Sequence, residues 1–334
     1  MKAKRVLVTG GVGFIGTHLV RQLAAQGVKV EVVDDLSSSS MTDETMSFYA
    51  KHGVTFNETS IEKWHPSSRV EYVEIYHLAC RVGPAHVTKY AGRMGSEIVS
   101  DAMKMAELAM RDGAPLLSIS TSEVYGRDSL GKPQDESSVL EFSAVPSARQ
   151  EYTLGKYMTE VSLRMLAETD PRLRVNLVRP FNIVGPGQGS EGGYVLPRFV
   201  RQALAGEPIT VFGDGTQIRA FTHVSDLVTA LLMIMSSDVC GKIYNVGTPD
   251  NTLSIGELAH HVVEILDSRS DICFVDPQKL FGTLYTNAPS KIPSIDLIKE
   301  EIGWNPAWSL REIIRDAADS VRSAAVRDTA EAVA

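Results

Sequence analysis

A short apolar strand followed by three glycines constrains the fold of this 334-residue chain more than any other feature. Residues 5–8 have a strand-like, largely apolar pattern, and Gly10, Gly13 and Gly16 follow at intervals of three as an amphipathic helix opens. Such glycines let the backbone approach a pyrophosphate closely, and the helix N-terminus favours its negative charge. The spacing predicts a strand–turn–helix unit that binds a dinucleotide, with a tight turn in another doubly wound protein as the alternative.

The second strand pattern, residues 28–33, ends in two carboxylates, Asp34 and Asp35. An acid about 20 residues beyond the glycine turn, at the tip of this strand, can accept hydrogen bonds from the hydroxyls of an adenosine ribose. The same acid would repel a 2′-phosphate. The sequence therefore favours NAD over NADP as the cofactor.

Strand and helix patterns alternate with short connections up to about residue 180. Further strands are expected at residues 54–56, 70–79, 115–119 and 174–180, and helices at 95–110 and 148–167. This alternation is typical of a parallel sheet that is covered on both faces. We therefore predict an α/β fold, namely a Rossmann-type doubly wound parallel sheet with a smaller C-terminal α/β substrate domain.

The regular alternation of strand and helix patterns ends after residue 180, which indicates a second domain. We expect an NAD-binding Rossmann domain at 1–180, rejoined by about 241–249. Residues 181–240 and 250–325 are expected to form the smaller, substrate-binding domain. Residues 326–334 are expected to form a frayed tail.

Composition and charge exclude several classes of protein. The net charge is −8 and no basic cluster occurs, which argues against nucleic acid as a partner. No apolar run approaches the roughly 18 residues of a membrane span, and no signal-peptide pattern precedes the first strand. Cys80, Cys240 and Cys273 fit neither a disulfide framework nor metal-ligand spacing. We expect a cytoplasmic protein with no metal site and no membrane partner.

Tyr152 and Lys156 stand four residues apart in the expected helix 148–167, so their side chains share one face. Thr121 follows the strand at 115–119. A lysine ammonium beside the tyrosine, with a positive nicotinamide nearby, would stabilise the phenolate and lower a pKa that is ordinarily about 10. We expect Tyr152 to accept the proton of a sugar hydroxyl while the hydride of the same carbon passes to NAD⁺. Thr121 would hold the oxygen, and Lys156 would also bind the nicotinamide ribose.

Eight segments together resemble the extended short-chain dehydrogenase/reductases that act on nucleotide sugars. They lie between about residues 5 and 310: TGGVGFIG at 9–16, VVDD at 32–35, YHLA at 76–79, STSEVYG at 120–126, YTLGK at 152–156, RPFNIVGPG at 179–187, FGDGTQIRAFTHVSD at 212–226 and IGWNP at 302–306. Jointly they are highly specific for this family and much less specific for one reaction.

The resemblance implies roles for further residues. The cofactor site would comprise Gly10, Gly13, Phe14, Ile15 and Gly16 at the pyrophosphate, Asp34 and Asp35 at the ribose, and Leu78, Ala79, Tyr152 and Lys156. Asn182 and Arg219 would hold the diphosphate of the nucleotide sugar, since a guanidinium fork suits phosphate oxygens. Phe212 would stack on the base. The alternatives are a surface salt bridge for Arg219 and core packing for Phe212.

A sugar oxidised to the ketone at C4 can react further in three ways. A carboxylate on C5 is β to the new ketone and leaves as carbon dioxide. With CH₂OH on C5, removal of the C5 proton expels water. If neither occurs, the ketone can turn over and be reduced on its other face, which gives the 4-epimer.

Two residues favour the first of these reactions, decarboxylation. Glu123, in Thr121-Ser122-Glu123, resembles the T-S-E of UDP-glucuronate decarboxylases and of GDP-mannose dehydratases, whereas similar 4-epimerases usually have a non-acidic residue there. Many 4,6-dehydratases have an Asp where this chain has Ser122. Arg149, three residues before Tyr152, matches decarboxylases and would receive a hexuronate carboxylate; its alternative is a helix-start arginine bonded to a loop.

We therefore expect an NAD-dependent enzyme that decarboxylates UDP-glucuronate through a 4-keto intermediate, with Thr121, Glu123, Tyr152 and Lys156 as catalytic residues. The alternatives are a UDP-sugar 4-epimerase and a nucleotide-sugar 4,6-dehydratase. A non-catalytic NAD-sensing protein and a reductase of small carbonyl compounds are less favoured classes. The resemblance also implies a homodimer through the helices near 96–110 and 148–166.

Some positions depart from the family pattern. Ser60 stands where an Asp often contacts adenine, and Ile98 where Asn is common. Lys291 and Ser294 replace an R-x-x-D pair that often supports the diphosphate. These departures leave the main site intact but suggest a divergent substrate.

Overall fold

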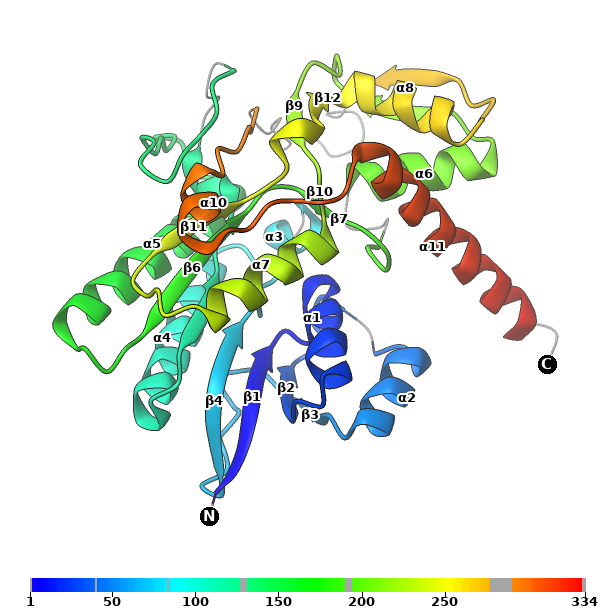
Figure 1. Cartoon of the computed structure of the whole chain (residues 1–334). Coiled ribbons are helices and arrows are strands. Elements are labelled where there is room, and N and C mark those ends of the chain that lie inside the picture. The colour runs from blue at the N-terminus through cyan, green and yellow to red at the C-terminus, as the bar shows by residue number, and fades with distance from the viewer. Residues whose placement is uncertain are drawn as a thin grey trace.

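A parallel sheet of seven strands forms the centre of the computed structural model, which describes residues 2–39, 41–82, 84–126, 131–189, 194–276 and 290–331. The strand order is β11-β6-β5-β4-β1-β2-β3. The strands are β1 (Ala3–Thr9), β2 (Val30–Asp34), β3 (Thr55–Glu58), β4 (Val70–His77), β5 (Leu116–Ile119), β6 (Val175–Pro180) and β11 (Ile243–Val246). The predicted doubly wound α/β fold is confirmed, and β11 rejoins the sheet at one edge as expected (Figure 1).

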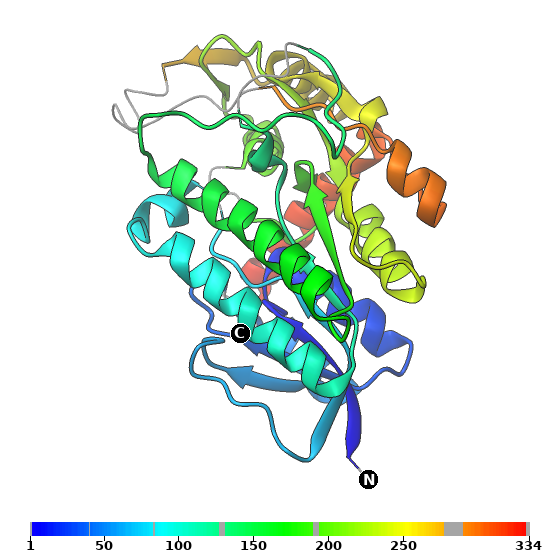
Figure 2. The same ribbon diagram turned by 90° about the vertical axis from the view of Figure 1, so that its left-hand side faces the viewer.

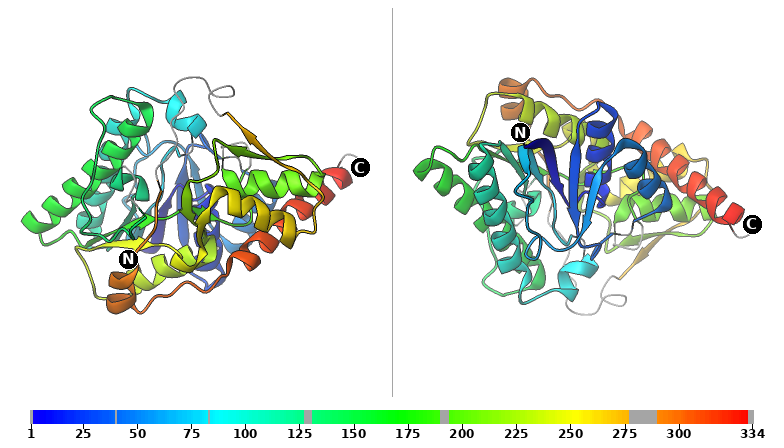
Figure 3. Two further views of the ribbon diagram at one scale, coloured as in Figure 1. Left: turned by 90° about the horizontal axis from the view of Figure 1, so that it is seen from above. Right: turned by 90° about the horizontal axis from the view of Figure 1, so that it is seen from below.

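Helices cover both faces of this sheet because successive side chains of a buried strand point in opposite directions. On β1, Val6 and Val8 belong to one apolar core, and Leu7 belongs to another. The first core includes α1 (Phe14–Ala25), α2 (Asp43–His52) and α7 (Val224–Ser236); the second includes α4 (Met94–Asp112) and α5 (Ala148–Thr169). Figure 3 shows these two groups of helices on opposite sides of the sheet.

A third apolar core lies in the C-terminal part of the chain, at the upper right of Figure 1. Its helices are α6 (Val195–Ala205), α8 (Ile255–Ile265) and α11 (Leu310–Glu331). Three two-stranded sheets accompany them: β7 (Ile183–Val184) with β10 (Thr222–His223), β8 (Ile209–Phe212) with β13 (Ile272–Val275), and β9 (Ile218–Ala220) with β12 (Thr252–Ser254). Shorter elements are α3 (Pro84–Lys89), α10 (Asp296–Ile302) and the 3-10 helices η1 (Ser122–Tyr125) and η2 (Pro249–Asn251).

Two boundaries differ from the expectation. The expected substrate domain includes helix α7, but the apolar residues of this helix pack against the central sheet beside α1. Helix α11 continues to Glu331, beyond the expected end near residue 325, since its alanine, arginine and glutamate residues favour helix. Residues 332–334 of the expected tail lie outside the described residues. The division into cofactor and substrate domains stays a prediction.

Candidate active site

The turn between β1 and α1 can be built only with glycine at its critical positions. Gly10 has a φ of +70°, and a Cβ on it would lie 2.7 Å from the backbone nitrogen of Ala79. A Cβ on Gly16 would lie 2.0 Å from the carbonyl oxygen of Gly10. Gly13 is the N-cap of α1, and no side chain caps this helix N-terminus. This close, uncapped turn fits the pyrophosphate of a dinucleotide.

Leu78 and Ala79 lie beside this turn, directly after β4. The Leu78 N–H donates to the carbonyl of Thr9 over 3.2 Å, and the Ala79 N–H donates to the Thr9 hydroxyl over 3.3 Å. Phe14 and Ile15 form the start of α1. The residues that the resemblance assigns to the pyrophosphate are therefore neighbours in space, and their contacts to NAD stay predictions.

The two carboxylates at the end of β2 have different environments. Asp34 is buried and accepts hydrogen bonds from the backbone N–H groups of Val12, over 3.0 Å, and Leu36, over 2.9 Å. Its carboxylate thus fastens the glycine turn, and burial raises its pKa. Asp35 instead pairs with Arg81 over 3.0 Å, a contact between distant segments that no local pattern predicts. Both remain predicted ribose ligands.

Thr121, Tyr152 and Lys156 meet beyond the carboxyl end of β5. Thr121 is the N-cap residue of η1, and its hydroxyl is hydrogen bonded to the Tyr152 side chain. The Tyr152 side chain, in a residue only 8% exposed, packs against Met94 and Ile98 of α4. Lys156 is buried and donates to the carbonyl of Ile119 over 2.8 Å. The structure thus brings together the three residues for which the sequence predicted proton and hydride transfer.

The pKa of Tyr152 is raised well above its ordinary value, mainly because the phenol is buried. The hydrogen bond with Thr121 opposes this effect without cancelling it. The amine of Lys156 is directed to the Ile119 carbonyl and to the Cys80 thiol. The predicted lowering of the Tyr152 pKa depends on a positive nicotinamide beside the phenol as well as on Lys156, and it stays a prediction.

Three distant segments supply a second cluster, made of Glu123 on η1, Arg149 at the start of α5 and Lys291 before α10. Glu123 Oε2 accepts from Arg149 Nε over 2.8 Å and from Nη2 over 2.5 Å. Glu123 Oε1 pairs closely with Nζ of Lys291, a residue only 2% exposed. Arg149 therefore points at Glu123 rather than at a loop, which was its alternative. We call these three residues the carboxylate cluster.

Charge and burial compete in setting the pKa values of Glu123 and Lys291, and both values are lowered. Burial favours a higher pKa for Glu123, but Lys291 and Arg149 outweigh it and lower the pKa to about 2. Burial lowers the pKa of Lys291 to about 8, against the opposing effect of Glu123. Near neutral pH, Glu123 is thus an acceptor and not an acid. Lys291 can exchange a proton close to physiological pH.

Lys291 is a site residue whose contact the sequence reasoning missed. It appeared there only as a departure from a diphosphate-binding pair. Its neighbour in that pair, Ser294, donates to Asp296 over 2.8 Å at the start of α10. Nothing in the local spacing around Lys291 indicates Glu123, which lies in a different segment of the chain. A lysine in place of the usual arginine was the one available signal.

A buried polar network lies beneath η1 and fixes its position. Arg179 and Glu160 form a buried ion pair, with Arg179 Nη2 and Glu160 Oε2 2.6 Å apart. Arg179 Nη1 donates to the hydroxyl of Tyr125 over 2.9 Å, and that hydroxyl donates to Asn245 over 2.7 Å. Ser120 donates to Glu160 over 2.5 Å. Networks of this kind specify a single arrangement of the elements that they join.

The predicted nucleotide-sugar ligands lie around β8 and β9. Asn182 has a φ of +37°, and its amide donates to the carbonyl of Ala220 over 3.1 Å. Arg219 donates to the carbonyl of Ile218 over 2.6 Å, and its backbone pairs with that of Lys291. The guanidinium carbon of Arg198 lies 3.7 Å from the centroid of the Phe212 ring, the ring expected to stack on a base. The roles of Asn182, Phe212 and Arg219 stay predictions.

Two searches of the described residues found nothing. No helix among them has both the length and the apolar character needed to cross a membrane. Within the same part of the chain, no group of three or more histidine, cysteine, aspartate or glutamate side chains could hold a metal ion.

Known proteins resemble this chain along most of its length. The model of the NAD dependent epimerase/dehydratase family matches residues 6–247. UDP-glucuronic acid decarboxylase 2 of Arabidopsis thaliana is 36% identical over 93% of this chain and 66% of its own length, slightly under two thirds. UDP-N-acetyl-alpha-D-glucosaminuronate decarboxylase of Bacillus cytotoxicus is 30% identical over 94% of this chain and 96% of its own.

A solved structure supports the same fold. The UDP-glucose 4-epimerase of Thermotoga maritima, determined with UDP-glucose, aligns with a TM-score of 0.82. The alignment covers 96% of this chain and 99% of the epimerase, at 26% sequence identity. The central sheet and its flanking helices thus have the same arrangement as in that epimerase.

Proposed function

This chain belongs to the NAD dependent epimerase/dehydratase family, and we propose that it decarboxylates a UDP-hexuronate, with UDP-glucuronate as the first candidate. The observation that carries the proposal is the carboxylate cluster, in which two cations, Arg149 and Lys291, face one carboxylate, Glu123. The local charge is net positive. A substrate carboxylate that enters beside Tyr152 would therefore find cations able to hold it.

The first half of the proposed reaction oxidises C4 of the sugar. Tyr152 accepts the proton of the C4 hydroxyl, and Thr121, already hydrogen bonded to the Tyr152 side chain, holds the substrate oxygen in line. Lys156 gives this buried site a positive charge. When bound, NAD⁺ supplies the hydride acceptor at C4 and later returns the hydride.

The second half breaks the bond between C5 and C6. Its electron pair moves toward the C4 ketone, the carboxylate leaves as carbon dioxide, and C5 then takes up a proton. Lys291, with a pKa of about 8, is the member of the carboxylate cluster suited to give that proton. Glu123, with a pKa of about 2, stays ionised and holds Lys291 and Arg149 in place.

The same residues weigh against the two alternatives. Elimination of water needs an acid that protonates the leaving hydroxyl, and neither Ser122 nor ionised Glu123 supplies it. Epimerisation needs the keto sugar to turn over, which a carboxylate anchored on Arg149 would oppose. A 4-epimerase and a 4,6-dehydratase therefore remain second and third candidates.

Product analysis tests the proposal. The purified protein would be incubated with NAD⁺ and one nucleotide sugar at a time. The three sugars are UDP-glucuronate, UDP-N-acetylglucosaminuronate and UDP-glucose. We expect carbon dioxide and a UDP-pentose from a uronate, detected by NMR spectroscopy and mass spectrometry, and no product from UDP-glucose. UDP-galacturonate from UDP-glucuronate would overturn decarboxylation and establish epimerisation. A 4-keto-6-deoxy sugar from UDP-glucose would establish dehydration.

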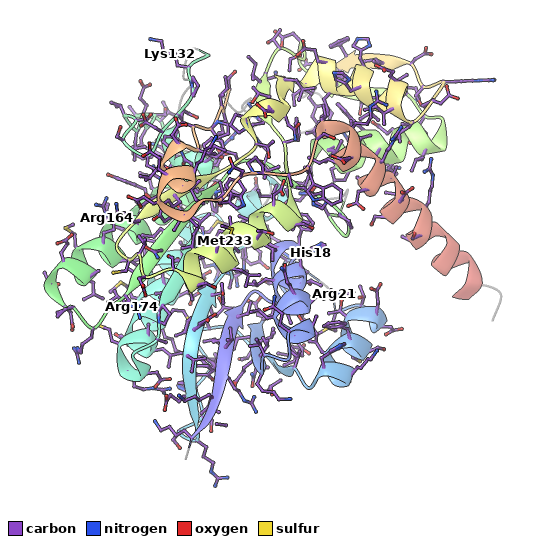
Figure 4. All side chains as sticks on the ribbon, viewed as in Figure 1. His18, Arg21, Lys132, Arg164, Arg174 and Met233 are labelled. Atoms are coloured by element: carbon purple, nitrogen blue, oxygen red, sulfur yellow. The ribbon has the colours of Figure 1, made fainter. Side chains whose placement is uncertain are left out.

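The role of Arg149 has its own test. In Arg149→Ala we expect the KM for the uronate to rise about tenfold or more, since a charged hydrogen bond contributes roughly 1.5–3 kcal/mol. The matched control is Arg164→Ala, at an exposed position on the same helix (Figure 4). Unchanged turnover of the uronate by Arg149→Ala would show that Arg149 does not bind the substrate carboxylate.

We also infer that the chain forms a homodimer through α5. Four apolar side chains on this helix are at least one-third exposed and follow a spacing of four, three and four: Leu154 (42%), Met158 (52%), Val161 (36%) and Met165 (54%). Figure 2 shows α4 and α5 side by side across one face of the molecule. A stripe of this kind supports an isologous contact between two copies. In Met158→Lys, we expect sedimentation to detect a monomer.

A cytoplasmic location stays an expectation from composition.

A further inference from the structure

Glu151, the residue directly before Tyr152, caps the neighbouring helix. Its Oε2 accepts a hydrogen bond from the backbone N–H of Gly92 over 2.6 Å, and its Oε1 accepts from that of Gly95 over 3.1 Å. Gly95 is the second residue of α4, whose N-cap residue, Arg93, makes no side-chain capping bond. A side chain of α5 thus satisfies an N–H group that the first turn of α4 leaves without a helical partner.

A second contact holds the two helices together one turn further along α5. A Cβ on Gly155 would lie 2.9 Å from Cα of Gly95, so the two backbones approach each other closely there. A Cβ on Gly95 would in turn lie 3.2 Å from Cγ of Glu151. The same two glycines and Glu151 therefore fix both the distance between the helices and their axial offset.

Tyr152 lies between these two contacts. Its ring packs against Met94 and Ile98, which flank Gly95 on α4, while its hydroxyl is hydrogen bonded to the Thr121 side chain from η1. A shift of α5 along α4 would move the ring over Met94 and Ile98 and pull the hydroxyl away from Thr121. The position of the phenol therefore depends on the fit between α4 and α5.

We propose that Glu151 is a positioning residue that sets the place of the Tyr152 hydroxyl by fastening the start of α5 to the N-terminus of α4. The role in turnover rests on the proposed function, whereas the capping contact does not. Two charge-assisted hydrogen bonds hold the Glu151 side chain. A displacement of about 1 Å at a reacting group can cost roughly 100-fold in rate, so a small shift of α5 is enough to matter.

The test compares Glu151→Ala and Glu151→Gln with the control Glu168→Ala, at an exposed position near the other end of α5. For Glu151→Ala we expect kcat to fall about 10- to 100-fold because the Tyr152 phenol is displaced. We expect a smaller rise in KM for UDP-glucuronate, because Arg149 lies on the same turn of α5 but stays paired with Glu123. Glu151→Gln keeps one acceptor oxygen and should recover most of kcat. Glu168→Ala should match the unaltered protein.

Hydrogen exchange gives a readout that does not depend on turnover. The amides of Gly92 and Gly95 should exchange faster in Glu151→Ala than in the unaltered protein, and their rates should be unchanged in Glu168→Ala. Unchanged exchange of both amides would overturn the proposal. So would wild-type kcat in Glu151→Ala, or a loss confined to KM. If the unaltered protein turns over no UDP-sugar, the proposed function fails, and the exchange rates then decide the capping contact alone.

Discussion

The cofactor turn and the carboxylate cluster are built in opposite ways. The turn takes its glycines from a single stretch of the chain, and their spacing alone dictates a backbone that no other residue can follow. The carboxylate cluster joins η1, the start of α5 and the segment before α10, and depends on charge rather than on backbone shape. The comparison indicates that the cofactor turn is locally encoded, whereas the site proposed to set the product is assembled by tertiary contacts.

Tyr152 is the proposed proton acceptor, and its substitution should have the largest effect. In Tyr152→Phe we expect kcat to fall about 1,000-fold, since a positioned proton acceptor contributes roughly 10²–10⁴-fold. The control is Tyr157→Phe, on the same helix, where the ring packs near Phe142. Steady-state kinetics with UDP-glucuronate measure both. A loss of less than tenfold in Tyr152→Phe would mean that another group accepts the proton.

Substitution of Lys291 separates the carboxylate cluster from the cofactor turn. In Lys291→Met we expect turnover of the uronate to fall about 100-fold, the lower end of the range for a lost proton donor, with NAD affinity unchanged. Titration of NAD and product analysis check the two halves of this expectation. Weakened NAD binding would show that the two regions are not independent.

The pH profile tests the same lysine without removing its charge. Because the pKa of Lys291 is lowered to about 8, its ammonium is present below that pH and is lost as the pH rises through it. We expect kcat to fall on the alkaline side with a midpoint near pH 8. In Lys291→Arg, any remaining activity should lack this limb, because a guanidinium stays protonated. An identical alkaline limb in Lys291→Arg would assign it to another group.

Substitution in the glycine turn should affect cofactor binding and folding together. A Cβ on Gly16 would overlap the Gly10 carbonyl, so Gly16→Ala should cost about 1–3 kcal/mol of unfolding free energy and weaken NAD binding. Gly189→Ala is the control, because its Cβ would meet nothing within 4 Å. Urea unfolding and NAD titration give the two quantities. Equal stability of the two variants would contradict the close approach at Gly16.

The smallest effect is expected at the carboxylates that end β2. Asp34 accepts two backbone hydrogen bonds in a buried position, while Asp35 forms a partly exposed pair with Arg81. Asp35→Asn should therefore change the Kd for NAD by less than about fivefold, since such pairs contribute roughly 0–1 kcal/mol. Asp34→Asn should weaken binding more. Calorimetric titration that finds the reverse order would make Asp35 the main ribose ligand.

The sequence was sufficient where a function depends on spacing within one element. The alternation of strands and helices and the glycine interval predict the fold, and the two residues four apart, Tyr152 and Lys156, lie beyond the carboxyl end of β5 with Thr121 as expected. Their roles in proton transfer stay predictions. The sequence did not predict the features that depend on burial or on contacts between distant segments. The Tyr152 pKa is raised because of burial that no local pattern reveals. The pairing of Lys291 with Glu123 arises only when the chain is folded.

The most direct test of the account follows one hydrogen atom. UDP-glucuronate carrying deuterium at C4 would be converted in ordinary water with the holoenzyme, and the UDP-pentose examined by NMR spectroscopy and mass spectrometry. We expect a slowed turnover and a product that retains deuterium at C4, because that atom leaves as hydride and is returned to the same carbon. A product with ordinary hydrogen at C4, or turnover with no isotope effect and no oxidation at C4, would contradict it.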